Sequence, residues 1–300
     1  LKKAARQGVA PELEKRIGII IDTGLVELQN DSKIYWNKAI IGRLTPGKDY
    51  LNPNFELIVD DILEQNQKIR LTKFLEKWLK NKIETTLKSL IDLKDLKEKN
   101  SSIKALAYQL YENNGVLKRD QVIEYLKNLA QNERKILREL GVKFGRYHVF
   151  LHRLIKPEAV SLRTLLWKNY HQKYFDLQPP TFGLNFIDNK NQKNKNFMLL
   201  CGFEKFESFF VRIDILERLF MQIINSKSDK EIKMIPEMLN LLGCNKDNFK
   251  KLLLNMGYRV IEKNDEVFFK YRPNKNNKKI YDKKVSKESP FGILKNLNLN

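Results

Sequence analysis

Residues 213–272 carry the most complete set of helix and turn signals in this chain, and these signals restrict the segment to one order of elements. Capping side chains, a first-turn proline and terminal glycines delimit three helices, over Ile215–Asn225, Pro236–Gly243 and Lys246–Met256. Two apolar strands follow, Tyr258–Glu262 and Glu266–Arg272, with a turn at Lys263–Asp265. Helix, helix-turn-helix and β-hairpin in this order predict a winged helix.

The predicted winged helix offers two sets of residues to a nucleic acid. In helix-turn-helix proteins the last helix of the motif enters the major groove of DNA. The candidates on that helix are Lys246, Asn248, Lys250, Lys251 and Asn255, and those on the hairpin are Arg259, Lys263, Lys270 and Arg272. Many winged helices instead pack against protein, so the sequence leaves both interpretations open.

A second informative stretch, Leu140–Trp167, lies near the middle of the chain. Gly141 follows the periodic run Asn132–Leu140 and is predicted to end that helix in a left-handed conformation. Gly145 is predicted to adopt a second unusual backbone angle. Pro157 suits the first turn of the next helix, because its missing N–H has no intrahelical partner there.

The segment between these two helices is basic and aromatic. From Leu140 to Lys173 the only acidic residue is Glu158. Basic side chains hold phosphate backbones, and aromatic rings stack on bases. The residues predicted to bind nucleic acid here are Lys143, Arg146, Tyr147, His148, Arg153, Lys156 and Arg163. The alternative interpretation is a packing junction with a solvated basic rim.

Two runs in this stretch carry a family resemblance: Gly-Val-Lys-Phe-Gly-Arg-Tyr-His-Val-Phe-Leu at 141–151 and Leu-Ile-Lys-Pro-Glu-Ala-Val-Ser-Leu-Arg-Thr-Leu-Leu-Trp at 154–167. Further runs that contribute are Arg212–Leu219, Pro236–Leu239, Gly257–Val260 and Ser289–Leu294. In these runs the chain resembles the C-terminal region of alphaproteobacterial Suv3-like helicases, which are superfamily 2 enzymes of the DExH type. The resemblance covers most of the chain and is weaker before Asp60.

The resemblance implies a division of labour in the full-length protein. Two motor domains would precede Leu1, bind ATP and Mg²⁺, and hydrolyse ATP. This chain would be a nucleic-acid-binding accessory region that guides a strand of RNA or DNA, expected to be single-stranded, or recruits partners. The matching runs are structural, so the resemblance assigns no catalytic residue and no cofactor to this chain.

One run mimics a nucleotide site. Gly42–Asp49 nearly matches the phosphate loop G-x-x-x-x-G-K-[ST], which needs a hydroxyl for Mg²⁺ and a helix directly after the lysine. Asp49 stands in the hydroxyl position, and no D-E-x-H or D-E-x-D box occurs in the sequence. His148 and His152 have the i,i+4 spacing of a helical metal pair but no third ligand nearby. We therefore expect no catalytic, cofactor or metal site in these residues.

Composition narrows the partners and the compartment. The net charge of +20 points to an anionic partner, although abundant Lys, Asn and Ile are also typical of an AT-rich genome. Cys201 and Cys244 form no C-x-x-C pair or zinc spacing, so a reducing, cytoplasmic setting is expected. No apolar run approaches the roughly 20 residues that span a bilayer. The first residue, Leu1, is compatible with a fragment.

The sequence predicts an α+β fold, mostly α-helical, with small β-hairpins and a winged-helix-like C-terminal module. We expect four parts: a small mixed unit with short hairpins at 1–52, a helical domain at 53–175, a β-hairpin plus winged-helix-like domain at 176–272, and a basic flexible tail at 273–300. Helices are predicted to begin at Pro11 and at Asn52-Pro53, and a long one to cover Ile69–Leu96. The predicted strands are Leu25–Leu28, Lys33–Trp36, Ala39–Leu44, Phe197–Gly202 and Ser208–Arg212.

Two other functions fit the same residues. The first is a non-enzymatic interaction module, in which the winged helix and the terminal segment 289–297 bind a protein partner. The second is a stand-alone nucleic-acid-binding protein that prefers one duplex sequence.

Overall fold

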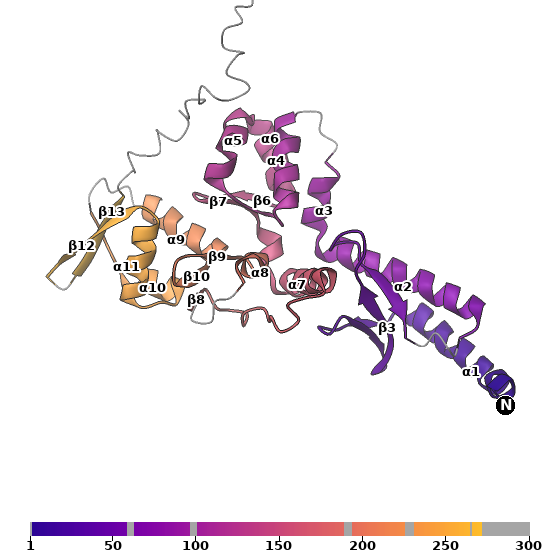
Figure 1. The fold of residues 1–300 in the computed structure, drawn as a ribbon. Helices are drawn as coiled ribbons and strands as arrows, with labels where there is room; N and C mark the ends of the chain where they lie inside the picture. The colour runs from indigo at the N-terminus through magenta and orange to yellow at the C-terminus, as the bar shows by residue number, and fades with distance from the viewer. Residues whose placement is uncertain are drawn as a thin grey trace, which may run out of the picture. The chain divides into compact units, whose positions relative to one another are not determined.

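The computed structural model describes residues 2–58, 63–96, 101–188, 194–225, 231–264 and 266–271, with residues 2–10 and 101 as backbone only (Figure 1). The fold is α+β with small antiparallel sheets, as predicted. Among the described residues, those up to 225 with 240–243 form one compact unit, and 231–239 with 244–271 form a second. Arg272 and the predicted tail lie outside the described residues.

The first unit begins with two long helices and a four-stranded sheet. The helices are α1 (Lys2–Thr23) and α2 (Gln65–Thr86), and the strands, in sheet order, are β1 (Glu27–Leu28), β2 (Lys33–Trp36), β3 (Ala39–Thr45) and β4 (Asn54–Leu57). The predicted strands between residues 25 and 44 are confirmed with small shifts at their ends. The predicted helix start at Pro11 is wrong, because α1 begins at Lys2 and contains Pro11.

Strand β4 stands where a helix is predicted from Asn52-Pro53. The Asp49 carboxylate accepts hydrogen bonds from the backbone N–H groups of Leu51 (2.9 Å) and Asn52 (3.0 Å), which turns the chain back toward β3. The run Gly42–Asp49 is thus a strand followed by a closed turn. Its carboxylate already holds the chain's own amides, and strand β4 rather than a helix follows this run.

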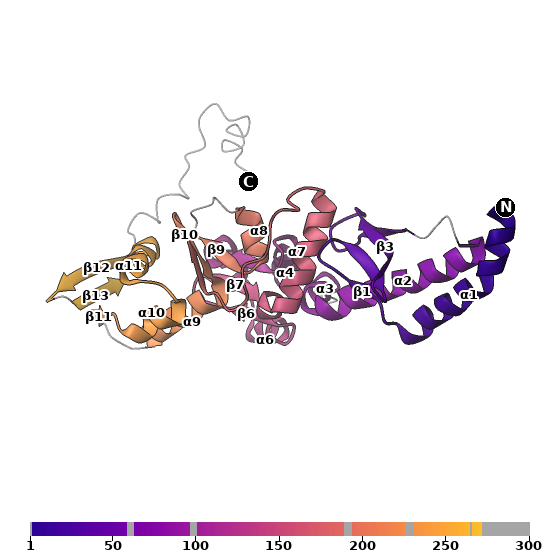
Figure 2. The same cartoon turned by 90° about the horizontal axis from the view of Figure 1, so that it is seen from below.

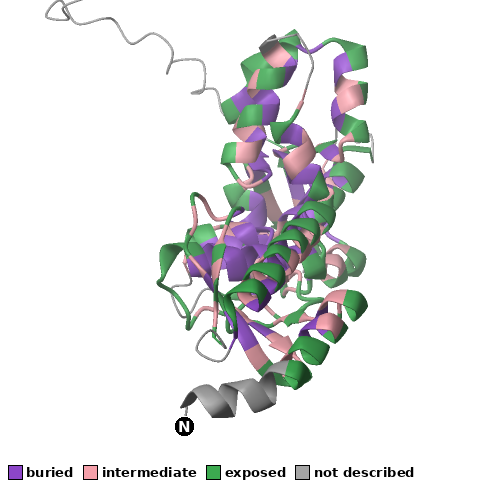
Figure 3. Ribbon diagram, turned by 90° about the vertical axis from the view of Figure 1, so that its right-hand side faces the viewer, coloured by how far each residue is buried: buried purple, intermediate pink, exposed green. Residues whose placement is uncertain are grey.

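The long helix predicted over Ile69–Leu96 is two helices. After α2 the backbone breaks at Leu87, which has φ −106° and ψ 21°, and α3 (Lys88–Lys94) begins. The predicted apolar stripe is confirmed: Leu71, Leu75, Leu79 and Ile83 recur every fourth residue and are buried. Leu87 itself is fully buried, so the break between the two helices does not expose its side chain. Buried residues gather along the inward faces of the helices (Figure 3).

After α3, the described chain contains three copies of one topology. The first copy follows α4 (Ser101–Glu112) and consists of β5 (Val116–Lys118), the 3₁₀ helix η1 (Arg119–Val122), α5 (Ile123–Asn128), α6 (Gln131–Glu139), β6 (Val142–Phe144) and β7 (His148–Leu151). The second consists of β8 (Phe186–Asp188), α8 (Lys195–Leu200), β9 (Phe203–Lys205) and β10 (Phe209–Arg212). The third, which lies in the second unit except for the end of α10, consists of β11 (Ile232–Lys233), α10 (Pro236–Leu242), α11 (Lys246–Asn255), β12 (Tyr258–Lys263) and β13 (Glu266–Tyr271).

Each copy, called here a strand–helix–hairpin repeat, builds the same three-stranded antiparallel sheet. The last strand lies in the middle, with strand orders β5-β7-β6, β8-β10-β9 and β11-β13-β12 (Figures 1 and 2). In each copy a glycine with positive φ joins the last helix to the hairpin: Gly141 (94°), Gly202 (83°) and Gly257 (82°). Only glycine adopts this conformation at little cost, so the three glycines mark the repeat in the sequence.

The first two repeats also share individual backbone hydrogen bonds. At the hairpin end, Gly145 donates to the His148 carbonyl and Phe206 donates to the Phe209 carbonyl, both at 2.8 Å. At the other end, the N–H of Leu151 reaches the Gly115 carbonyl, 2.8 Å away, and the N–H of Arg212 reaches the Asn185 carbonyl, 2.9 Å away. The two hairpins therefore have the same register.

Several predicted elements around the second repeat change. The strand predicted at Phe197–Gly202 is helix α8, because the Asn194 side chain caps it by accepting from the Phe197 N–H at 3.0 Å. The strand predicted at Ser208–Arg212 is confirmed as β10. Helix α9 (Ile213–Asn225) begins two residues before its predicted start, and Asp214 lies in its first turn rather than before it.

The predicted elements of the second unit are confirmed. The Asn245 side chain accepts from the Asn248 N–H at 2.8 Å and so caps α11, and the predicted hairpin is β12–β13. Helix α9, which the winged-helix prediction counts as the first helix, belongs to the first unit. Among the described helices none is both long enough and apolar enough to cross a membrane.

Candidate nucleic-acid interface

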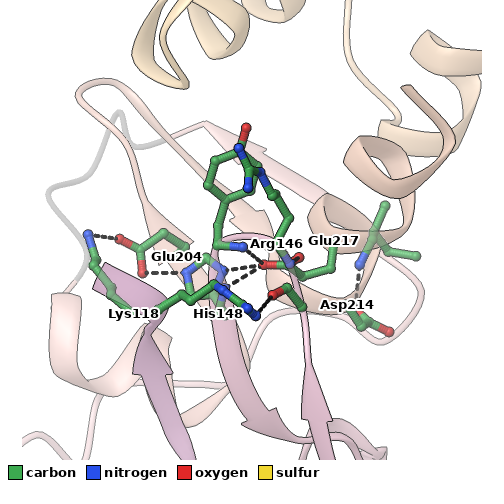
Figure 4. Close-up of polar contacts among 10 residues, drawn as sticks. Lys118, Arg146, His148, Glu204, Asp214 and Glu217 are labelled. Carbon is green, nitrogen blue, oxygen red and sulfur yellow. Dashed lines mark hydrogen bonds and ion pairs between the residues drawn. The ribbon is translucent and has the colours of Figure 1, made fainter. Parts of the chain in front are cut away.

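The β6–β7 turn (Gly145–Tyr147) is fixed by a carboxylate from α9. The backbone N–H groups of Arg146, Tyr147 and His148 all donate to Glu217, at 2.9 Å for Tyr147 and 2.7 Å for His148 (Figure 4). Successive N–H groups that converge in this way form an anion-binding concavity. Here the buried Glu217 side chain fills it, so the shape of the turn is set by the fold.

Gly145 is required at this turn for space. A Cβ atom built on Gly145 would lie 2.4 Å from the carboxyl carbon of Glu217. The φ of Gly145 is not positive, so the predicted unusual backbone angle is wrong and close approach takes its place. Arg119, in η1, supports the same turn: its guanidinium donates to the Gly145 carbonyl and its N–H to the Tyr147 carbonyl, both at 2.7 Å.

His148 lies inside a buried ionic network rather than on the surface. Its Nδ1 is 2.9 Å from Glu217 Oε1, and its Nε2 is 3.6 Å from Glu204 Oε2. Lys118 Nζ approaches the other Glu204 oxygen at 2.7 Å (Figure 4). Only 2% of His148 is exposed, so it is removed from the predicted binding surface. Both ring nitrogens face carboxylates, which is the environment of a protonated imidazole.

The charges in this network shift one another. Burial alone would lower the pKa of His148, but the neighbouring carboxylates of Glu204 and Glu217 outweigh it and raise that pKa above its ordinary value. Burial alone would raise the pKa of Glu204, but His148 and Lys118 lower it. The network is therefore a charged structural clamp between the first two repeats and α9.

Arg163 is the second predicted binding residue that the fold removes from the surface. It lies in α7 (Pro157–His171) and is fully buried. Its guanidinium donates to three backbone carbonyls, those of Asn114 (2.9 Å), Leu154 (2.8 Å) and Leu200 (2.6 Å). Arg163 thus ties the end of α4, the 3₁₀ helix η2 (His152–Ile155) and α8 together. A nucleic-acid contact at Arg163 is ruled out by this burial.

Four of the predicted basic residues do reach solvent. Lys143, Arg146, Arg153 and Lys156, called here the central basic residues, are all exposed. The guanidinium of Arg146 lies over the ring of Tyr147, 6.0 Å from its centroid. That ring is partly buried and packs edge-on against Phe220 at 4.9 Å. Tyr147 therefore supports the turn more than it offers a free stacking face.

Positive charge converges around His152 as well. Burial lowers the pKa of His152, and Lys156 and then Lys143 and Arg212 lower it further against the opposing effect of Asp214. Lys143 and Lys156 therefore both lie near the His152 side chain. His152 lies in η2 and His148 in β7, so the two are not an i,i+4 pair on one helix. Within the described residues, no cluster of three or more His, Cys, Asp or Glu side chains has metal-binding geometry.

An open groove lies beside the β6–β7 turn. Its lining combines two guanidinium groups with apolar side chains: Arg119, Phe144, Gly145, Arg146, Met221 and Ile224. Met221 and Ile224 project from α9, and each is 44% exposed. The guanidinium of Arg138 lies 5.6 Å from the Phe144 ring centroid. A groove lined by both guanidinium groups and apolar side chains suits a ligand that has both phosphates and flat rings.

The second unit pairs several of its predicted binding residues with acids. Lys250 contacts Glu262 at 2.7 Å, and Lys263 contacts Glu231 at 2.6 Å. Asn248 is partly buried and donates its N–H to the cap residue Asn245. Asn255 is exposed, and its side chain donates to the Lys251 carbonyl at 2.8 Å. The remaining basic candidates are exposed and form no ion pair with any other described residue: Lys246, Lys251, Arg259 and Lys270. Arg272 and the predicted docking segment 289–297 lie outside the described residues.

The residues that support this site were not predicted from the sequence. Glu217, Glu204, Lys118 and Arg119 do not appear among the predicted candidates. One signal was present for Glu217: it lies between Ile213 and Phe220 on the apolar side of α9, where a carboxylate needs a partner. No protein-family model, no curated protein and no solved structure matches this chain. The resemblance to Suv3-like helicases therefore stays a prediction.

Proposed function

We propose that this chain binds a nucleic-acid strand through the central basic residues, as the accessory C-terminal region of a Suv3-like ATP-dependent helicase. The observation that carries the proposal is the β6–β7 turn. Its exposed Arg146 is held in place by the buried Glu217, which takes three backbone N–H groups from the turn. A cation on a rigid turn loses little conformational entropy when it contacts a phosphate.

Charge placement supports the same function. Two acids contact the hairpin region of the first repeat from α9 and β9. These acids, Glu217 and Glu204, are buried, and their charges are paired with His148 and Lys118. The exposed charges of that region are Lys143, Arg146, Arg153 and Lys156. Around the β6–β7 turn, positive charge therefore faces outward while the carboxylates of Glu204 and Glu217 are covered, which favours a polyanion.

The repeat topology supports a winged-helix interpretation of the first and third copies. Both have a strand, two helices and a hairpin in that order. Both also carry exposed basic residues on the hairpin: Lys143 and Arg146 in the first, Arg259 and Lys270 in the third. In such motifs the helix before the hairpin contacts DNA. The exposed basic residues on these helices are Lys135 and Arg138 on α6 and Lys246 and Lys251 on α11.

The proposal assigns ATP, Mg²⁺ and strand translocation to motor domains outside these residues. The present chain would guide RNA or DNA, with no sequence preference expected from backbone contacts alone. The alternative, a regulator that reads one duplex sequence, would instead discriminate by about 1–3 kcal/mol per base pair.

Charge reversal tests the proposal. The purified chain is titrated against a labelled single strand of RNA and of DNA, first as wild type and then as Arg146→Glu and Lys156→Glu. We expect each variant to bind more weakly to every strand tested, because phosphate contacts are independent of sequence. Lys104→Glu is the matched control: Lys104 is exposed on α4, and the substitution changes net charge by the same amount. Equal affinity loss in Lys104→Glu would show that only total charge matters and would overturn the site.

A further inference from the structure

The end of α7 and the segment that follows it expose an unusual number of aromatic rings. In this aromatic loop (Tyr170–Leu184), the exposed fractions are 38% for Tyr170, 42% for Tyr174, 54% for Phe175 and 52% for Phe182. Its only aliphatic side chains are Leu177 and Leu184. Folding leaves large apolar rings in water only at a cost, so a run of them marks a binding surface.

The rings are ordered rather than scattered. Tyr174 lies parallel to Trp167, with centroids 5.3 Å apart and an interplanar angle of 20°. Trp167 contacts Phe197 at 5.9 Å on the inner side and His171 at 4.5 Å. Trp167 is 9% exposed, whereas Tyr174 is 42% exposed. Tyr174 is therefore the outermost ring of a stack that is anchored in the core.

The backbone adopts costly conformations to place this ring. Gln172 has φ +50° and Tyr174 has φ +64°, both in the left-handed region that non-glycine residues seldom occupy. Strained backbone of this kind is concentrated at functional sites. The exposed Lys173 lies between the two strained residues, and the exposed Asp176 is the loop's only acid.

We infer that the aromatic loop stacks the bases of an unpaired nucleic-acid strand, with Tyr174 as the central stacking residue. This inference rests on the proposed function and names its ligand class, because the faces of bases are free only in single strands. Sequence-tolerant single-strand binding combines a basic track for the backbone with aromatic rings for the bases. The central basic residues supply the first and the aromatic loop the second.

Helix α7 sets the spacing between the two parts. Lys156 immediately precedes this 15-residue helix, and His171 ends it. At about 1.5 Å per residue the helix is about 22 Å long. Stacked nucleotides rise by about 3.4 Å, so a strand needs about six nucleotides to reach from Lys156 to the aromatic loop. The loop should therefore contribute only to strands longer than this.

The test compares Tyr174→Ala with wild type on single strands of about four and about twelve nucleotides. We expect the variant to lose roughly 5- to 150-fold in affinity for the longer strand, the range of a lost stacked base, and nothing for the shorter one. The slope of affinity against salt should stay unchanged, because no phosphate contact is lost. Tyr174→Phe keeps the ring and should bind like wild type.

Two controls make the result decisive. Tyr108→Ala removes a more exposed ring from α4, 60% exposed against 42% for Tyr174, and should have no effect. A twelve-nucleotide strand that lacks its bases should bind wild type and Tyr174→Ala equally. If Tyr174→Ala binds the long strand as wild type does, the loop is not a base platform, although Arg146→Glu still weakens binding. If Arg146→Glu, Lys156→Glu and Tyr174→Ala all leave affinity unchanged, the proposed function fails as well.

Discussion

Glu217 shows how one buried residue can shape an exposed one. Its carboxylate receives three backbone N–H groups of the β6–β7 turn and the ring of His148. A buried carboxylate without such partners would destabilise the fold, so the turn and the acid stabilise each other. Arg146 gains its position from this arrangement without contributing to it through its side chain.

Gly145→Ala tests the close approach at this turn. The added methyl group would overlap the Glu217 carboxylate, so we expect a loss of about 1–3 kcal/mol in unfolding free energy, typical of overpacking. Urea unfolding measures it. Gly18→Ala in α1 is the matched control, because nothing lies within 4 Å of its added Cβ, and alanine favours the helix there. A Gly145→Ala protein as stable as wild type would show that the carboxylate has room to move.

The His148 network predicts a direction for the pH dependence of stability. The pKa of His148 is higher in the folded state than its ordinary value of 6.5, so its contribution is complete below that pH and is lost as pH rises through the folded pKa. Glu204 has a lowered pKa and contributes above its ordinary value, 4.5. We therefore expect the stability that this network contributes to fall as pH increases above 6.5.

His148→Phe checks this assignment, because phenylalanine occupies the equivalent position, Phe209, in the second repeat. The variant should unfold more easily below pH 6.5, where Glu204 and Glu217 lose a cationic partner, and its stability should depend less on pH above that value. Urea unfolding on both sides of pH 6.5 measures this. An unchanged pH profile would mean that folding leaves the pKa of His148 at its ordinary value.

At the scale of elements, local sequence signals were sufficient to predict a helix where a capping residue marks its start and a glycine marks its end. Helices α10 and α11 and the hairpin after them are predicted because each start and stop depends on adjacent residues. Strand β8 is not predicted, since its three residues are held only by pairing with β10, more than twenty residues away. Helix α8 is mistaken for a strand because a short apolar run suits either structure.

Asn245→Ala tests the local signal itself. Loss of the hydrogen bond from Asn248 should destabilise α11 by about 1 kcal/mol, the usual effect of removing an N-cap. Thermal or urea unfolding of the full chain, followed by amide hydrogen exchange in α11, measures it. Lys246→Ala at the next position leaves the cap intact and should change stability by less than about 0.5 kcal/mol. Equal effects from the two substitutions would remove the cap as the cause.

At the scale of the whole molecule, the fold decides which basic residues face a partner. The sequence identified Lys143, Arg146, Arg153 and Lys156, and they are exposed. It equally identified His148 and Arg163, which the fold buries, because their partners come from distant positions: Glu217 in one case and the carbonyls of Asn114, Leu154 and Leu200 in the other. Composition cannot separate these two classes, since both are basic residues in a basic stretch. The repeated topology was hidden for a similar reason: the three copies share glycines and strand pairing rather than side chains.

The most direct test is the salt dependence of single-strand binding by the full chain. If the central basic residues contact phosphates, the logarithm of affinity falls linearly with the logarithm of salt concentration, with a slope of about 0.7 per phosphate. The double variant Arg146→Glu, Lys156→Glu should then lower the slope by about 1.4, which corresponds to two lost contacts. A double variant with the slope of wild type would contradict the account, because the strand would then be held elsewhere on the protein.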